Sequence, residues 1–564
     1  MSADNAPSIL KSALKFLLLA FPIVAQAAGP VTPNAGSILQ QVQPLMPQVP
    51  SSTGTGLTIE QQGSGNLPPS SPFEVKRIQL SGNTLFDIPT LHALVENSEG
   101  KTITLSDLGE LAARITDYYH THGYPLARAY IPAQTIEAGL VRIEIIEARY
   151  GKVKLDNHSR VVEPLLDATL SVLQSGQFIG QAGMDRILLL LSDVPGVEIS
   201  ATLKPGETVG TSDLLVEAIP GPLVSGNLAL DNYGNQYTGR KRAGATVNFI
   251  NPFRHGDYIS LGGLTSGDGM NYARASYDVL LNGRGSHIGG SYSSMYYILG
   301  DTLASLNGHG TARVGSLWVR HPFMRSRDVN LYGQVQYDRM MLRDHIDASG
   351  IQTDRHLDIW TANLSGDDRD TFLPGEAINT WSVVWASGRV IFDNAGAQST
   401  DAQTGNTQAG FSKWNVSFSR LQSVGQKNAL FISFAGQLAN GNLDSSQKLA
   451  VGGANSVRAY DMGAVSGDTG LLLTTEFRRD LGQLWQGSFQ SVGFVDTAHM
   501  TINKNVWGGG ANSAILTGVG VGLSWMGPNR WSARTYIAKP VGSTPELTGI
   551  GASTRVWLDM GRSF

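Results

Sequence analysis

Apolar and polar residues alternate along most of the chain beyond residue 222. Segments of about ten residues place apolar side chains on one face and glycine, serine or polar side chains on the other, with turn residues between them. In "WNVSFSR" Trp414, Val416 and Phe418 share a face, and in "GVGVGLSW" the valines alternate with glycines. No helical period persists in this region, so the pattern predicts a sheet domain over residues 221–564.

This sheet domain is better explained by a membrane barrel than by a soluble sandwich. A sandwich also alternates, but one uninterrupted domain of this size with polar or glycine inner positions fits a barrel whose apolar face meets lipid. Lipid offers no hydrogen bonds to the backbone, so the sheet has to close on itself. About 340 residues at roughly 20 per strand and connection give about sixteen antiparallel strands.

Two smaller modules precede the barrel. Residues 71–149 and 150–220 each contain an alternating strand, two segments of helical period and two further alternating strands. A β-α-α-β-β unit that occurs twice in succession is an internal repeat, and each copy is long enough for a small sheet covered by two helices. We therefore predict two small α+β domains with these boundaries.

Residues 1–27 predict export from the cytoplasm. Lys11 and Lys15 precede the apolar run "FLLLAFPIVA", and Ala25 and Ala27 form the small-residue cleavage pattern of a signal peptide. Residues 28–70 then have the proline, glutamine, serine and glycine content of a linker.

One segment of this linker has helical period. Ile38, Leu39, Val42 and Leu45 lie close to one face of a helix that Pro47 would end. A short amphipathic helix on a flexible arm and a disordered linker with scattered apolar residues both fit this segment.

Composition narrows the function classes. Only 16% of the 564 residues are charged, the net charge is −4 and there is no cysteine. These values give no electrostatic reason to expect nucleic acid as a partner, and they exclude disulfides and cysteine-based metal or redox sites. His120 and His122 are spaced to point in different directions on a helix.

No enzyme motif stands out either. No nucleophile elbow or pair of catalytic carboxylates is present, so we predict no enzymatic activity, no cofactor and no metal site. The acidic segment "GDDRD" at 366–370 is predicted to be a charged loop, with a calcium site as the alternative.

Four segments resemble those of a known family. They are "GYPLARAYIPAQTIEAGLVRIEIIEARYGKV" at 123–153, "LDNYGNQYTGRKRAGATVNFINPFRHGD" at 230–257, "LAVGGANSVRAYDMG" at 449–463 and "GFVDTA" at 493–498. With the order of signal peptide, linker, two modules and barrel, the chain resembles the two-partner secretion transporters of the bacterial outer membrane. The resemblance implies that the modules are POTRA (polypeptide-transport-associated) domains.

The resemblance also implies a site inside the barrel. The tip of a long extracellular loop, with Val457, Arg458 and Tyr460, would fold back into the lumen, where Arg458 would pair with Asp496 beside Phe494 on the barrel wall. A guanidinium can grip a carboxylate through two parallel hydrogen bonds. The alternative is that Arg458 faces solvent and Asp496 is an unrelated lumen charge.

Two positions of the site depart from the family pattern. Ala459 and Ala498 stand where the family usually has glycine. An alanine disfavours positive φ and adds a methyl group, so the geometry of the tip is the open question.

The function implied by the resemblance is export of an unfolded exoprotein. The POTRA domains would bind it in the periplasm by strand addition, although a role as mere spacers is the alternative, and the linker helix would occupy the resting pore. The expected partners are a large secreted exoprotein with an N-terminal secretion domain, outer-membrane lipids and, through Phe564, the barrel-assembly machinery. The alternative function is assembly of outer-membrane proteins.

Overall fold

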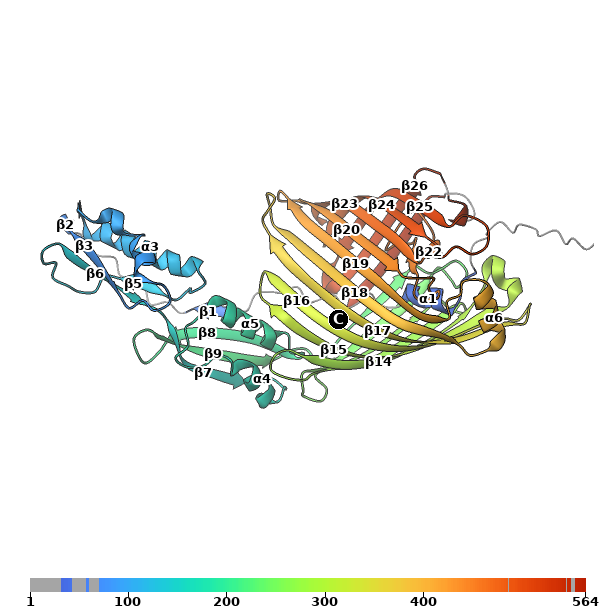
Figure 1. The fold of residues 1–564 in the computed structure, drawn as a ribbon, viewed down its shortest axis with the longest axis horizontal. Helices are drawn as coiled ribbons and strands as arrows, with labels where there is room; N and C mark the ends of the chain where they lie inside the picture. Colours follow the sequence, from blue (N-terminus) through green and yellow to red (C-terminus); the bar gives the residue numbers. More distant parts are fainter. Residues whose placement is uncertain (1–31, 43–56, 60–69, 485, 544, 549–552) are drawn as a thin grey trace, which may run out of the picture.

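The structure is a computed structural model that describes residues 32–42, 57–59, 70–484, 486–543, 545–548 and 553–564. Two small α+β modules lie at one end of a large barrel, and a short helix, α1 (Ala35–Val42), lies among the barrel strands (Figure 1). The predicted signal peptide, residues 1–27, lies outside the described residues. In the part that is described, no helix is long and apolar enough to span a membrane.

The barrel is closed and contains sixteen antiparallel strands, which confirms the predicted architecture. The first and last strands pair from Asn227 with Ser563 to Asp231 with Asp559. The strands are β10 (Val224–Asp231), β11 (Arg242–Ile250), β12 (Asp257–Thr265), β13 (Met270–Leu280), β14 (His287–Ile298), β15 (Gly308–Arg325), β16 (Val329–Ile346), β17 (Ile351–Asp370), β18 (Ala377–Phe392), β19 (Ala409–Val424), β20 (Asn428–Ala439), β23 (Thr469–Leu484), β24 (Gly487–Thr501), β25 (Ser513–Met526), β26 (Trp531–Pro540) and β27 (Arg555–Ser563).

The two faces of the barrel follow the predicted alternation. Trp414, Val416 and Phe418 are exposed on the outer face, as are Val519 and Val521 of the glycine-alternating strand. The C-terminal Phe564 continues the outer row and exchanges backbone hydrogen bonds of 3.0 Å with Gly226 next to it. The outer face is thus apolar, as contact with lipid requires.

Two expectations for the barrel region are wrong in detail. A helix, α6 (Ala395–Gln403), connects β18 to β19; it carries no apolar stripe, and the absence of helical period therefore did not reveal it. The acidic segment 366–370 is the end of β17, not a loop. Its carboxylates are held across the strands, because Asn330 donates a hydrogen bond to Asp367 and the Arg420 cation donates two to Asp370.

The first module is a three-stranded sheet with a helix packed on it. Its elements are β2 (Phe73–Val75), β3 (Arg77–Ser81), α2 (Ile88–His92), β4 (Lys101–Ile103), α3 (Leu105–Thr121), β5 (Arg128–Tyr130) and β6 (Leu140–Ile146). The sheet order is β3-β6-β5, and β2 and β4 form a separate small pair. Thr104 and Asp107 form a capping box at the start of α3, which buries Leu108 and Ile115 against Val141 of the sheet.

Glu147 is a buried carboxylate at the end of this sheet. It accepts hydrogen bonds from the backbone N–H groups of Thr84 and Leu85, both 2.8 Å long, from the Thr84 hydroxyl and from the Tyr119 hydroxyl at 2.7 Å. Burial acts to raise the pKa of Glu147, but these hydrogen bonds outweigh it and hold the pKa below its usual value. The carboxylate therefore ties the loop after β3 to α3.

We expect the Glu147→Ala variant to destabilise the first module by about 1–3 kcal/mol, because its buried donors lose their acceptor. Because the folded pKa lies below the unfolded value of about 4.3, the wild-type contribution is complete above that value and disappears as the pH falls through the folded pKa. Hydrogen exchange at the Thr84 and Leu85 amides of the full-length protein measures this destabilisation. Glu110→Ala on the exposed face of α3 is the control, and equal protection in both variants contradicts the assignment.

The second module repeats the arrangement and gains a fourth strand from the linker. Its elements are β7 (Arg149–Asn157), α4 (Glu163–Leu170), α5 (Gln181–Ser192), β8 (Val197–Pro205) and β9 (Thr211–Pro220). The sheet order is β1-β8-β9-β7, where β1 (Leu57–Ile59) belongs to the linker and runs parallel to β8. Leu57 and Ile59 pack on the core of the module.

The second module is anchored to one rim of the barrel. Asp193, at the end of α5, accepts two hydrogen bonds of 2.7 and 2.8 Å from Arg325 at the end of β15, and Arg327 pairs with Asp185 at 2.7 Å. Leu280 of β13 joins the apolar core of the module. The sheet of this module is therefore fixed next to the barrel opening.

Candidate functional site

The connection between β20 and β23 folds back into the barrel lumen. It contains a small hairpin, β21 (Leu449–Val451) paired with β22 (Val465–Gly467), and the predicted motif residues lie in the turn between its strands. Val457 and Tyr460 are buried in one apolar cluster with Phe494 of the barrel wall. The structure thus places the loop tip against the inner wall.

Arg458 and Asp496 are in direct contact. Arg458 donates to the two carboxylate oxygens of Asp496 through Nε at 2.9 Å and Nη2 at 2.8 Å, and its backbone N–H donates to the same group at 3.1 Å. The exposed fraction is 4% for Arg458 and 0% for Asp496. This is a bidentate, desolvated ion pair, the geometry in which such pairs are strongest.

A second carboxylate, which the sequence did not reveal, completes the contact. Glu476 of β23 accepts from Arg458 Nη1 at 2.7 Å and also binds Arg478, so that two cations face two anions. We call Arg458, Asp496 and Glu476 the latch. In the sequence, Glu476 cannot be distinguished from other inward polar residues of an alternating strand. It reaches the loop tip because the register of β23 and β24 places it opposite Phe494.

Aromatic side chains enclose the latch. The Arg458 guanidinium carbon lies 3.4 Å from the centre of the Phe494 ring, within cation–π range. Trp557 of β27 donates its indole N–H to the Arg458 carbonyl at 2.6 Å. The tip therefore touches β23, β24 and the last barrel strand at once.

The alanines at the two unusual positions fit without strain. The backbone of Ala459 does not adopt a positive φ. Its methyl group packs on Gly518 of β25, where an added Cβ would come within 2.5 Å of the Ala459 Cβ. Ala498 is buried in the same apolar cluster. The extra methyl at 459 is thus accommodated by a missing side chain on the wall.

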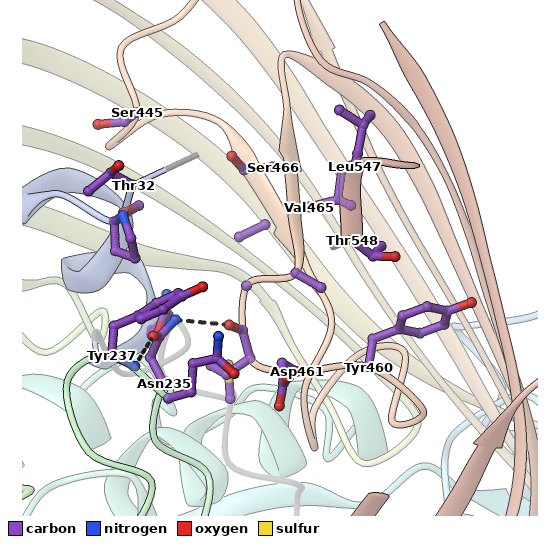
Figure 2. Close-up of a pocket in the computed structure, with 18 of the residues that line it drawn as sticks. Thr32, Asn235, Tyr237, Ser445, Tyr460, Asp461, Val465, Ser466, Leu547 and Thr548 are labelled. Atoms are coloured by element: carbon purple, nitrogen blue, oxygen red, sulfur yellow. Dashed lines mark hydrogen bonds between the residues drawn. The ribbon is translucent and has the colours of Figure 1, made fainter. Parts of the chain in front are cut away.

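A second ion-pair group holds the tip at Asp461, three residues after Arg458. Asp461 accepts hydrogen bonds of 2.6 Å from Arg240, in the β10–β11 connection, and from Arg555 of β27. Asn235 of the same connection donates to the Met462 carbonyl. Figure 2 shows Asp461 and Asn235 around a cavity of about 150 Å³ that also borders α1. The tip is thus anchored a second time, by residues of β27 and of the β10–β11 connection.

The linker helix α1 lies inside the barrel. Ile38 and Leu39 are 1% exposed and belong to one apolar cluster with inward residues of β13 to β19, such as Met340 and Leu357. Val42 is partly buried against the same cluster. Leu45, the fourth predicted residue of this face, lies outside the described residues.

A buried arginine connects α1 with the base of the loop. Arg355 of β17 donates to Asp344 of β16 at 2.8 Å and to Asp444 of the loop at 2.5 Å. Asp344 also accepts from the backbone N–H of Ala35 at 2.6 Å, at the first turn of α1. We call Asp344, Arg355 and Asp444 the lumen triad. A carboxylate at a helix N-terminus is favourable. Here Arg355 connects that carboxylate to Asp444 of the loop.

The lumen triad gave no signal in the sequence. Its members come from β16, β17 and the loop, and each alone is an ordinary polar residue. In the described part of the chain, no group of three or more histidine, aspartate or glutamate side chains could hold a metal ion.

Comparisons with known proteins match both the first module and the barrel of this chain. The ShlB-type POTRA domain model matches residues 73–148, and the model of the haemolysin secretion/activation protein ShlB/FhaC/HecB matches residues 210–525. The heme/hemopexin transporter protein HuxB of Haemophilus influenzae is 27% identical over 552 residues, covering 94% of this chain and 95% of the relative. The outer membrane transporter CdiB of Escherichia coli is 24% identical and covers 79% of this chain and 77% of its own.

Solved structures show the same fold. CdiB from Escherichia coli superposes with a TM-score of 0.68 at 20% identity, covering 91% of this chain and 94% of its own. BamA from Haemophilus ducreyi lacking POTRA domains 1-3 gives 0.52 at 15% identity, covering 88% of this chain and 100% of its own. The fold is therefore that of outer-membrane barrels that carry POTRA domains.

The family model decides between the transporters and BamA as the class to which the chain belongs. The chain belongs to the haemolysin secretion/activation protein ShlB/FhaC/HecB family, the outer-membrane transporters of two-partner secretion. As in the family, the barrel lies in the outer membrane and the POTRA domains lie in the periplasm. The rim that holds the second module is thus periplasmic and the opposite rim extracellular.

Proposed function

We propose that this chain recognises an unfolded exoprotein in the periplasm and exports it through the barrel lumen. The observation that carries the proposal is that separate segments, α1 and the loop with the latch, fill the lumen, and that ion pairs hold both. A separate segment held by ion pairs can move out of the lumen and take its charged side chains into water. Side chains of the barrel strands that filled the lumen could not move out in this way. The expected partner is a large secreted exoprotein with an N-terminal secretion domain.

The composition of the latch is appropriate for a contact that breaks during export. A buried ion pair contributes little net stability compared with an apolar contact, but removal of one partner is strongly unfavourable. Arg458 therefore stays on Asp496 and Glu476 until other charged or polar groups, such as those of an arriving chain, can replace them. We infer that the loop leaves the wall during export.

Recognition would use the edge of the second POTRA sheet. β1 shows that β8 accepts an extended segment by parallel pairing, with Leu57 opposite Ala201 and Ile59 opposite Leu203. Main-chain pairing of this kind tolerates many sequences, and the apolar sites beside the edge select the side chains. An exoprotein segment would take the place of β1 on β8.

A reversible cross-link tests this function. Because the chain has no cysteine, Thr58→Cys combined with Thr202→Cys, at directly paired positions, creates one possible disulfide. In cells that make the chain and its exoprotein, we expect the oxidised double variant to lose secretion and a reductant to restore it. Each single variant is a control. Secretion by the cross-linked protein at the wild-type level contradicts the role of this edge.

A further inference from the structure

Four arginines lie on the outer face of the barrel within the run of neighbouring strands β15 to β18. Arg313 is in β15, Arg339 and Arg343 are in β16, and Arg389 is in β18, and all four are exposed. The same outer face carries exposed apolar residues that meet lipid, namely Leu317 in β15, Val335 in β16, Trp360 in β17 and Trp385 in β18. The guanidinium groups thus point away from the lumen.

The arginines begin where the aromatic residues end. Tyr337 pairs with Trp360, and their rings are 5.1 Å apart. The next outward pair toward the extracellular rim is Arg339 with Asp358, and Arg389 is the neighbour of Asp358 on the other side. Tyrosine and tryptophan mark the boundary between hydrocarbon and headgroups, so the arginines lie at headgroup level on the extracellular side.

The second row is closer to the rim. Arg313 lies opposite Met341, and this places it diagonally between Arg339 and Arg343. Arg343 is opposite Asp354 on the other side. The four arginines therefore form one patch across β15 to β18, the group of long strands at the front of the barrel in Figure 1. We call it the arginine patch.

Most of this charge is uncompensated within the protein. Arg339 lies 3.6 Å from Asp358. Among the described residues, Arg313, Arg343 and Arg389 have no hydrogen bond or ion pair, although the carboxylates of Asp354 and Asp358 lie in the same patch. Four cations and two anions leave the surface positive.

The charge is concentrated in this sector of the barrel, because outside it the outward extracellular positions of β26 hold a single lysine, Lys539. The outward positions in the extracellular halves of β19, β20, β23, β24 and β25 hold no lysine or arginine in their sequences. An arginine on the lipid face is unfavourable unless it reaches a polar or charged group outside the hydrocarbon. Three such residues without a protein partner, all within β15 to β18, therefore point to an external anion.

We propose that the arginine patch binds the phosphorylated headgroup of an outer-leaflet glycolipid. Guanidinium groups bind phosphate oxygens in pairs, and several of them around one headgroup can bind more than one phosphate. The apolar residues below, such as Trp360 and Trp385, are placed to contact the acyl chains of the same molecule. This inference goes beyond export, and it depends only on the outer-membrane placement of the barrel.

The test measures binding of lipid A, the phosphorylated anchor of outer-leaflet glycolipid, to the full-length protein in detergent by native mass spectrometry. We expect the triple variant Arg313→Gln, Arg343→Gln, Arg389→Gln to bind lipid A at least about tenfold more weakly than wild type. The reason is that a hydrogen bond to a charged group contributes more binding free energy than one between neutral groups, and the variant loses three such contacts. Lys539→Gln, an exposed outward residue of β26, is the matched control and should bind like wild type. Heat-modifiable gel mobility checks that every variant is folded.

Two further arms distinguish the source of the anion. Lipid A from which both phosphates have been removed should bind wild type as weakly as the triple variant binds intact lipid A. Inorganic pyrophosphate should not displace bound lipid A at equal concentration. Undiminished binding by the triple variant, or equal binding of the dephosphorylated lipid, overturns the proposal, and displacement by pyrophosphate shows a site for free anions instead of lipid.

Discussion

Replacing Arg458 by alanine is expected to abolish export of the exoprotein while the barrel remains inserted in the outer membrane. The change leaves Asp496 and Glu476 buried without their shared cation, at a cost of about 3–5 kcal/mol for the closed loop. The loop should then leave the wall, and the interactions that return it after each export event are lost. Secretion into the medium is the measurement, and heat-modifiable mobility reports the inserted barrel.

Two companion variants separate charge from geometry. Arg458→Lys keeps one charge but loses the bidentate contact, so we expect only partial export. Arg530→Ala changes an exposed arginine in the turn before β26 and should export like wild type. Wild-type secretion by Arg458→Ala would remove the role assigned to the latch.

The variant that combines Ile38→Asp with Leu39→Asp is expected to open the resting pore. Both side chains are fully enclosed by the lumen cluster, and a carboxylate there has no partner, so α1 should leave the barrel. We expect conductance across a planar bilayer to rise several-fold above that of the wild-type protein.

A control variant in the same linker shows whether the effect on conductance depends on where the negative charge is added. Thr58→Asp adds a negative charge at the exposed residue of β1 and should leave the conductance unchanged. An unchanged current through the Ile38→Asp, Leu39→Asp variant would show that α1 does not close the pore.

The barrel could be predicted from the sequence because its signal is repeated sixteen times. Alternation sets the outer face of every strand, and the closed sheet follows from the need to pair all backbone groups. The two modules before the barrel could be predicted for a similar reason, since the sequence of each contains both strand alternation and helical period. The helix α6 escaped because it packs few apolar residues and has no periodic face to detect.

The site was only partly visible. Arg458 and Asp496 could be paired because each lies in a motif that resembles the family pattern, whereas Glu476 and the lumen triad have no motif. Arg355 meets Asp444 across 89 positions of sequence, and the partnership exists only after the barrel has closed. β1 was missed because three residues are too few to show a period.

The parallel pairing of β1 with β8 would give a direction to an exoprotein segment that takes the place of β1. β8 starts beside the barrel, where Gly196 packs on Asn251 of a periplasmic turn, and it runs outward to the hairpin where Gly210 lies against Ile146 of the first POTRA domain. A segment that replaces β1 in the same orientation has its N-terminal end at the pore and its C-terminal end toward the periplasm. On the proposed function, the edge of the sheet would fix the polarity of the bound exoprotein segment, so that its N-terminal end faces the barrel.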